Sequence, residues 1–87
     1  MAKMTFSMLV TKDAWTELAA GSGYTSFGVI VETHTLLVFI GDSTPAIDEA
    51  DYMTTEGELA IDIPSSMTVY VRADIESCQV SGYKVPA

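Results

Sequence analysis

The chain has 87 residues with 12 acidic and 4 basic side chains, which gives a formal charge of −8. This length allows a single domain, residues 1–87, because a second domain would have no apolar core of its own. The acidic balance excludes nucleic acid and an anionic membrane as expected partners, since both carry negative charge themselves.

The first part of the chain is dominated by apolar residues at every second position, which is the period of a strand with one buried face. This alternation predicts strands over residues 5–10 and 26–32. Residues 12–20 fit either a short helix or a strand, and we favour the strand because the segment is short for an independent helix. Turn signals follow at Gly21 to Gly23 and at Glu32 to His34.

The segment from Leu36 to Ile40 is apolar at five consecutive positions, so it predicts a strand whose two faces both need cover. The protein's own core covers one face. The other requires a long loop or a second chain, because soluble monomers rarely leave such a surface exposed. We expect Leu37 and Phe39 at a contact with another subunit or another protein. Tyr70 and Arg72 are candidate neighbours there, because Tyr and Arg are enriched at interfaces.

Residues 41–57 form the longest predicted loop, and alternation resumes over 58–63, 67–74 and 78–85, with a bulge expected at Gly82. Turn signals recur roughly every 8–12 residues, a spacing typical of all-β sandwiches and barrels. We predict an all-β fold, a small antiparallel β-sandwich of jelly-roll character with about seven to eight short strands. The residues expected to be buried together in its core are Phe27, Val29, Val31, Leu59, Ile61, Val69 and Val71.

No pattern in the sequence indicates catalysis, a cofactor or a metal site. The single histidine, His34, is typical of a solvated turn residue, and no G-x-S-x-G nucleophile motif is present. Carboxylates at Asp42, Asp48, Glu49 and Asp51 could ligate calcium, but their spacing matches no EF-hand, so we favour a solvated acidic loop. We therefore expect no enzyme, no catalytic residue, no cofactor and no bound metal.

Cysteine and aromatic residues each have a functional and a structural interpretation. Cys78 is the only cysteine and shares its strand phase with Val80, which predicts a small buried residue rather than a reactive thiol. Residues 1–10 lack the apolar core of a signal peptide, which indicates synthesis in a reducing cytoplasm or export without such a signal. The aromatic rings could stack on sugars, although packing is the favoured interpretation: Trp15, Tyr24, Tyr52, Tyr70 and Tyr83.

Three stretches of the chain together resemble a known class of proteins. They are Asp13-Ala14-Trp15-Thr16-Glu17-Leu18, Leu37-Val38-Phe39-Ile40-Gly41-Asp42-Ser43-Thr44-Pro45-Ala46 and Met67-Thr68-Val69-Tyr70-Val71-Arg72-Ala73. A Trp-containing strand, a strand that ends in Gly-Asp before a Pro-Ala loop, and a late V-Y-V-R-A strand resemble small β-structured virion proteins of tailed bacteriophages. Several of those are capsid decoration, head-fibre or head–tail accessory components. The acidic loop at 48–51 departs from that pattern, so no ligand is carried over.

The resemblance implies a non-enzymatic virion structural protein, made in the host cytoplasm and assembled as an oligomeric capsid decoration or head accessory protein. It implies a homo-oligomer, with a trimer favoured, and a major capsid protein or other virion protein as partner. The alternative is a host-surface or carbohydrate-binding module carried on a virion. A small intracellular enzyme or regulator is the third hypothesis.

Overall fold

The computed structural model describes residues 4–87, the side chain of Thr33 excepted, and has six strands and no helix in that range. They are β1 (Thr5–Val10), β2 (Thr16–Ala20), β3 (Tyr24–Gly41), β4 (Met53–Asp62), β5 (Thr68–Ala73) and β6 (Cys78–Pro86). The all-β prediction is confirmed. The strand interpretation of residues 12–20 is confirmed over 16–20 only, and residues 12–15 lie before the strand. Residues 1–3, part of the segment searched for an export signal, lie outside the described range.

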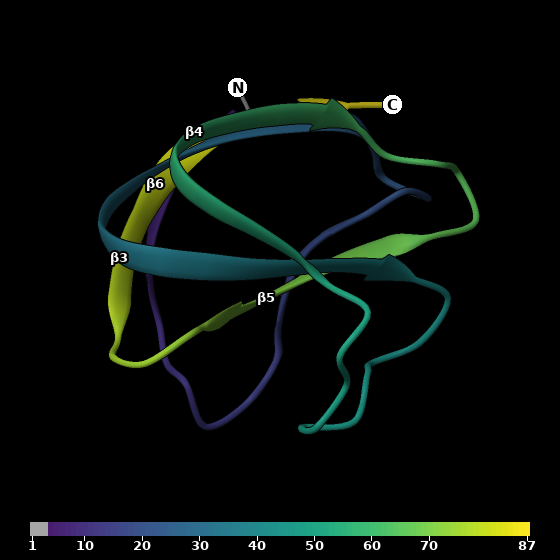
Figure 1. Ribbon diagram of the computed structural model, residues 1–87. Helices are drawn as coiled ribbons and strands as arrows, with labels where there is room; N and C mark the ends of the chain where they lie inside the picture. The colour runs from purple at the N-terminus through teal and green to yellow at the C-terminus, as the bar shows by residue number, and fades with distance from the viewer. Residues whose placement is uncertain (1–3) are drawn as a thin grey trace.

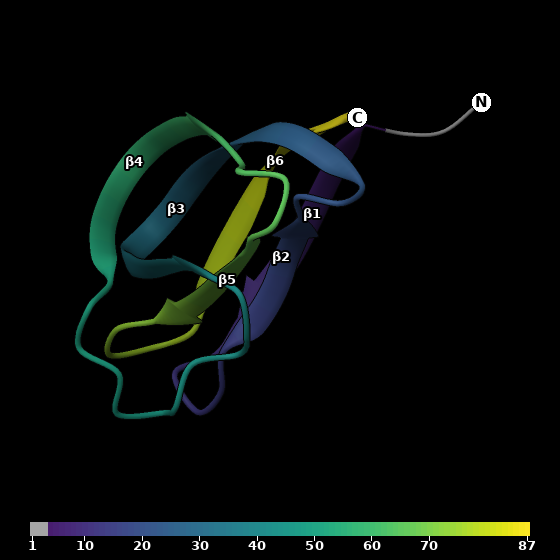
Figure 2. The same cartoon turned by 90° about the vertical axis from the view of Figure 1, so that its right-hand side faces the viewer.

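All six strands belong to one antiparallel sheet in the order β1-β6-β3-β5-β2, and β4 pairs with the other side of β3. The sheet curls on itself into a nearly closed barrel (Figures 1 and 2). The two-sheet jelly-roll sandwich is not confirmed, because every strand in residues 4–87 pairs within this single sheet.

The curl of the sheet arises at a corner in β3, the longest strand. The first part of β3 pairs with β6 and the second part with β5, while β4 follows both parts. Between the pair Val31–Gly57 and the pair Leu36–Thr55, the four residues 32–35 of β3 face a single residue of β4. Extra residues on one strand bend it and increase its twist, so β3 turns here and changes partner.

Local backbone and hydrogen bonds hold this corner. His34 and Gly57 have positive φ angles of 66° and 85°, a left-handed conformation that glycine adopts without steric cost. The carbonyl of Thr35 accepts hydrogen bonds from the Asp74 amide at 3.2 Å and from the Cys78 thiol at 3.4 Å. The turn expected at residues 32–34 is therefore a corner within one continuous strand.

The corner divides the barrel into two parts, which we name after the strand that pairs with β3 in each. The β6 half contains β1, β6 and the paired residues 24–31 of β3 and 57–62 of β4. The β5 half contains β2, β5 and the paired residues 36–41 of β3 and 53–55 of β4. Each half has an inner face toward the barrel and an outer face, because side chains alternate along a strand.

The main apolar core fills the space between the inner faces. Its buried members are Val10, Leu18, Ala19, Phe27, Val29, Val31, Leu36, Val38, Ile63, Val69, Val71, Ala73, Cys78 and Val80. Five of the seven predicted core residues are among them. The other two, Leu59 and Ile61, pack against this core but stay half-buried, because β4 has a paired neighbour on one side only in the described structure.

The bulge predicted at Gly82 is wrong, because β6 pairs with β1 through Phe6–Gly82 and Met8–Val80 without a register shift. Glycine is needed there for another reason: a Cβ at position 82 would overlap the backbone of Gly28 on the neighbouring strand. The strand phase therefore continues, and Lys84 turns toward the barrel, where its Nζ donates a hydrogen bond to the Leu18 carbonyl at 3.1 Å.

Candidate functional site

The four residues predicted at a subunit contact lie side by side on the outer face of the β5 half. Leu37 pairs with Arg72 and Phe39 pairs with Tyr70 across β3 and β5. Directly opposed residues of an antiparallel pair project to the same side of the sheet, so the four side chains share one face. The structure thus brings the four candidates together.

This outer face is covered by the chain itself. Trp15 packs with Leu37 and Tyr70 in a second apolar cluster, and Phe39 and Tyr52 pack against it. As a result Leu37 is 1% exposed and Tyr70 8% exposed. The segment before β2 and the loop before β4 supply the cover that the five apolar residues need. The contact with another subunit stays a prediction, and Leu37 offers it almost no surface in this structure.

Trp15 is fixed in place from several directions. Its indole Nε1 donates a hydrogen bond to the Ala46 carbonyl at 3.0 Å, which ties the loop of residues 42–52 to the β5 half. The guanidinium carbon of Arg72 lies 5.3 Å from the centre of the Trp15 ring, a cation–π distance, and its Nη1 donates to the Lys12 carbonyl at 2.9 Å. This ring, considered above for sugar stacking, is engaged in packing.

The acidic loop uses one of its carboxylates internally. Oε2 of Glu49 accepts a hydrogen bond from the Asp51 amide at 3.1 Å, and the Glu49 amide donates to the Ala46 carbonyl at 3.0 Å. Within residues 4–87, no three His, Cys, Asp or Glu side chains come together in the manner of a metal site. The same residues contain no helix long and apolar enough to cross a membrane.

The histidine and the cysteine lie near the corner but do not form a reactive pair. Nε2 of His34 is 3.0 Å from Oε2 of Glu76, and both side chains are exposed, so this contact contributes little to stability. Cys78 is 0% exposed, which confirms its predicted burial. Burial, and next the negative charge of Asp74, raise the pKa of the Cys78 thiol, so its nucleophilic thiolate form is disfavoured.

An uncovered surface lies on the outer face of the β6 half, which we call the Tyr83 face. Gly28 pairs with Ala60 on one side and with Tyr83 on the other. Ile30, the next outward-facing residue of β3, pairs with Glu58. Ile30 is 48% exposed and Tyr83 is 42% exposed. The outward faces of the two halves therefore differ, because one has an aromatic cover from its own chain and the other presents apolar side chains to solvent.

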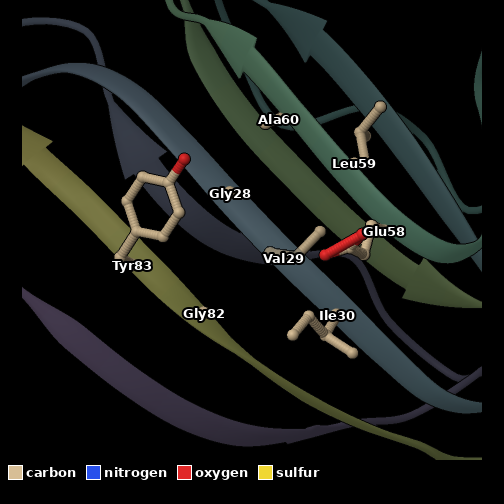
Figure 3. Close-up of a pocket in the computed structure, with 8 residues that line it drawn as sticks. All are labelled: Gly28, Val29, Ile30, Glu58, Leu59, Ala60, Gly82 and Tyr83. Atoms are coloured by element: carbon tan, nitrogen blue, oxygen red, sulfur yellow. The ribbon is translucent and has the colours of Figure 1, made fainter.

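Small residues hollow the Tyr83 face into a groove (Figure 3). Its volume is about 220 Å³, and its lining residues are Gly28, Val29, Ile30, Glu58, Leu59, Ala60, Gly82 and Tyr83. A second hollow of about 160 Å³ shares Ala60 and Tyr83 and includes Asp62. The Tyr83 ring lies over Gly28, since a Cβ at position 28 would be 2.6 Å from the ring's Cζ.

The sequence interpretation missed the Tyr83 face. Alternation along β3 places Gly28 and Ile30 outward, but it does not tell which residues of β4 and β6 lie beside them. Gly28 lies between Ala60 and Tyr83 because of the register in which the three strands pair. Local sequence patterns do not specify that register.

Comparison of the chain with protein-family models, with curated proteins and with solved structures finds no match. The resemblance to bacteriophage virion proteins therefore depends on the three sequence stretches alone.

Proposed function

We propose that this protein is a non-enzymatic docking protein and acts as a capsid decoration or head accessory protein of a bacteriophage virion. The observation that carries the docking part is the uncovered Tyr83 face. Soluble proteins that present clustered apolar side chains within a polar surround commonly use them for binding. The three sequence stretches support the virion setting.

The shape and chemistry of the groove favour a protein partner over a small substrate. A volume of about 220 Å³ falls below the roughly 300–1,000 Å³ typical of small-molecule sites. The histidine and the buried thiol lie at the corner and outside the groove lining. A rigid barrel that binds only the assembled shell would stabilise that shell by mass action.

Co-sedimentation with capsids of the parent phage tests this proposal. The purified chain is expected to pellet with assembled capsids, to remain in the supernatant with unassembled capsid protein, and to raise the temperature at which capsids disrupt. Absence from the capsid pellet over a range of concentrations would overturn the virion proposal. Light scattering of the free protein tests the trimer separately, because a trimer has three times the 9.3 kDa chain mass.

A further inference from the structure

The Tyr83 face has an acidic rim along β4. Glu58 pairs with Ile30, Asp62 pairs with Ser26, and both carboxylates are exposed beside the two hollows. An apolar centre with carboxylates along one side presents two chemistries to a partner at once. It favours an apolar side chain in the groove beside the Tyr83 ring and a cation beside the rim.

Two of the cations that the structure describes, Lys84 and Arg72, are engaged elsewhere. Lys84 turns into the barrel and donates to the Leu18 carbonyl, and Arg72 lies over Trp15 on the β5 half. The backbone carbonyl of Lys12 accepts a hydrogen bond from Arg72, so Lys12 also lies near the β5 half. Among residues 4–87, the one close contact between a basic and an acidic side chain joins His34 and Glu76 at the corner. Within the described part of the chain no ion pair therefore involves Glu58 or Asp62, and both carboxylates can bind a partner's cations.

We propose that the Tyr83 face receives an extended segment of a different protein, which places one apolar side chain in the groove and Lys or Arg beside Glu58 and Asp62. This inference deepens the proposed docking function and rests on it. The groove volume suits a single side chain rather than a bound metabolite. The positive charge of the segment follows from the acidic rim and the formal charge of −8.

A second copy of this chain is the less suitable occupant. Two copies meeting through this face would bring the carboxylates of Glu58 and Asp62 from both chains to one interface. Like charges that face each other across strands are destabilising, and each chain also has a formal charge of −8. A basic partner removes this repulsion and gains attraction in its place.

Gly28 allows the shape of the groove to be changed without changing its charge. A Cβ at position 28 would overlap the far end of the Tyr83 ring, which is a flexible side chain at the surface. The substitution Gly28→Ala therefore moves the ring and partly fills the groove, while Glu58 and Asp62 keep their charges. Loss of binding in this variant would report on the groove itself.

Selection from a library of random dodecapeptides displayed on yeast tests the proposal with the wild-type chain as target. Enriched peptides are expected to share an apolar residue flanked by Lys or Arg. Their affinity should fall by about tenfold in the variant Glu58→Gln/Asp62→Asn, and also in Gly28→Ala. The matched control is Asp42→Asn/Asp48→Asn, which removes the same charge from the exposed loop and should bind like the wild type.

The proposal is overturned by a lack of enrichment or by enrichment of peptides without basic residues. It is also overturned if the peptides bind equally to the wild type, to Glu58→Gln/Asp62→Asn and to Gly28→Ala. An equal loss in the rim and loop charge variants would also contradict it, because attraction would then be general. Capsid co-sedimentation separates the two claims. If peptides bind the groove but the chain does not bind capsids, only the virion proposal is contradicted. If the chain binds capsids but no peptides are selected, only the proposed chemistry of the partner segment is contradicted.

Discussion

At the scale of single residues, side chains on the inner face of the barrel differ in how deeply they are buried. Leu36 is 0% exposed in the main core, whereas Ile61 is half-buried on β4. We expect Leu36→Ala to lower the free energy of unfolding by about 2–5 kcal/mol, through lost burial and a cavity. Ile61→Ala should cost clearly less, because solvent already reaches it. Urea unfolding of both variants gives the comparison, and equal losses would contradict the edge position of β4.

Cys78 makes the stability of the fold depend on pH in the alkaline range. Burial and Asp74 raise its pKa above the ordinary value of 9.0, so the folded state holds the thiol proton more tightly than the unfolded state. The resulting stabilisation is complete below the unfolded pKa and is lost as the pH rises toward the folded pKa. For this one group, the free energy of unfolding falls by at most about 1.4 kcal/mol per pH unit.

The variant Cys78→Ala isolates this contribution. Unfolding free energies of wild type and variant, measured from about pH 7 to about pH 10, should converge at the alkaline end. All other side chains are the same in both proteins, so the difference between the two unfolding free energies reports on position 78. A constant difference across this range would mean that the thiol ionises alike in the folded and unfolded chains.

At the scale of elements, periodicity predicted individual strands well and their connections poorly. Alternation placed strands over 5–10 and 67–74 close to β1 and β5. It divided β3 at residues 32–34, because the polar residues of a strand corner resemble those of a turn between strands. Whether such a segment reverses or only bends the chain depends on pairing with distant strands, which no local pattern contains.

The corner in β3 and β4 depends on the left-handed backbone of Gly57. Its φ is +85°, and a Cβ there would meet no atom within 4 Å, so the cost of Gly57→Ala is conformational alone. We expect this variant to lose about 1–2 kcal/mol of stability. Gly23→Ala is the control, because a Cβ at position 23 makes an ordinary 3.9 Å contact and no positive φ is required there. Thermal unfolding should show it unchanged or slightly stabilised.

The loop of residues 42–52 depends on the indole of Trp15. In Trp15→Phe the ring still packs on the β5 half, but the hydrogen bond to the Ala46 carbonyl is lost, at a cost of about 0.5–1.5 kcal/mol from that bond. Hydrogen exchange and limited proteolysis should show this loop opening before the rest of the barrel. Uniform opening of all six strands would show that the loop is not held mainly by this bond.

At the scale of the whole molecule, the sequence predicted which residues share a face but not what covers them. The apolar run from Leu36 to Ile40 predicted that both faces of its strand are covered, and the structure has such a cover. Tyr70 and Arg72 lie beside Leu37 and Phe39, as expected. The cover by Trp15 joins segments far apart in the chain, so alternation alone could not identify it. The Tyr83 face is built from three strands, so it could not be predicted without the register in which they pair.

Two double variants decide which outer face of the barrel docks. Ile30→Ser/Tyr83→Ser changes exposed side chains, so we expect each substitution to alter the unfolding free energy by about 0.5 kcal/mol or less and capsid binding to be lost. Leu37→Ser/Phe39→Ser opens the aromatic cluster beneath Trp15 and should lower the melting temperature strongly, because Leu37 is buried there. Melting curves and capsid co-sedimentation are measured on both variants. If the Leu37 variant stays folded and fails to bind while the Tyr83 variant binds normally, docking occurs through the β5 half. The opposite pattern assigns docking to the Tyr83 face, where the chain leaves its apolar side chains without cover.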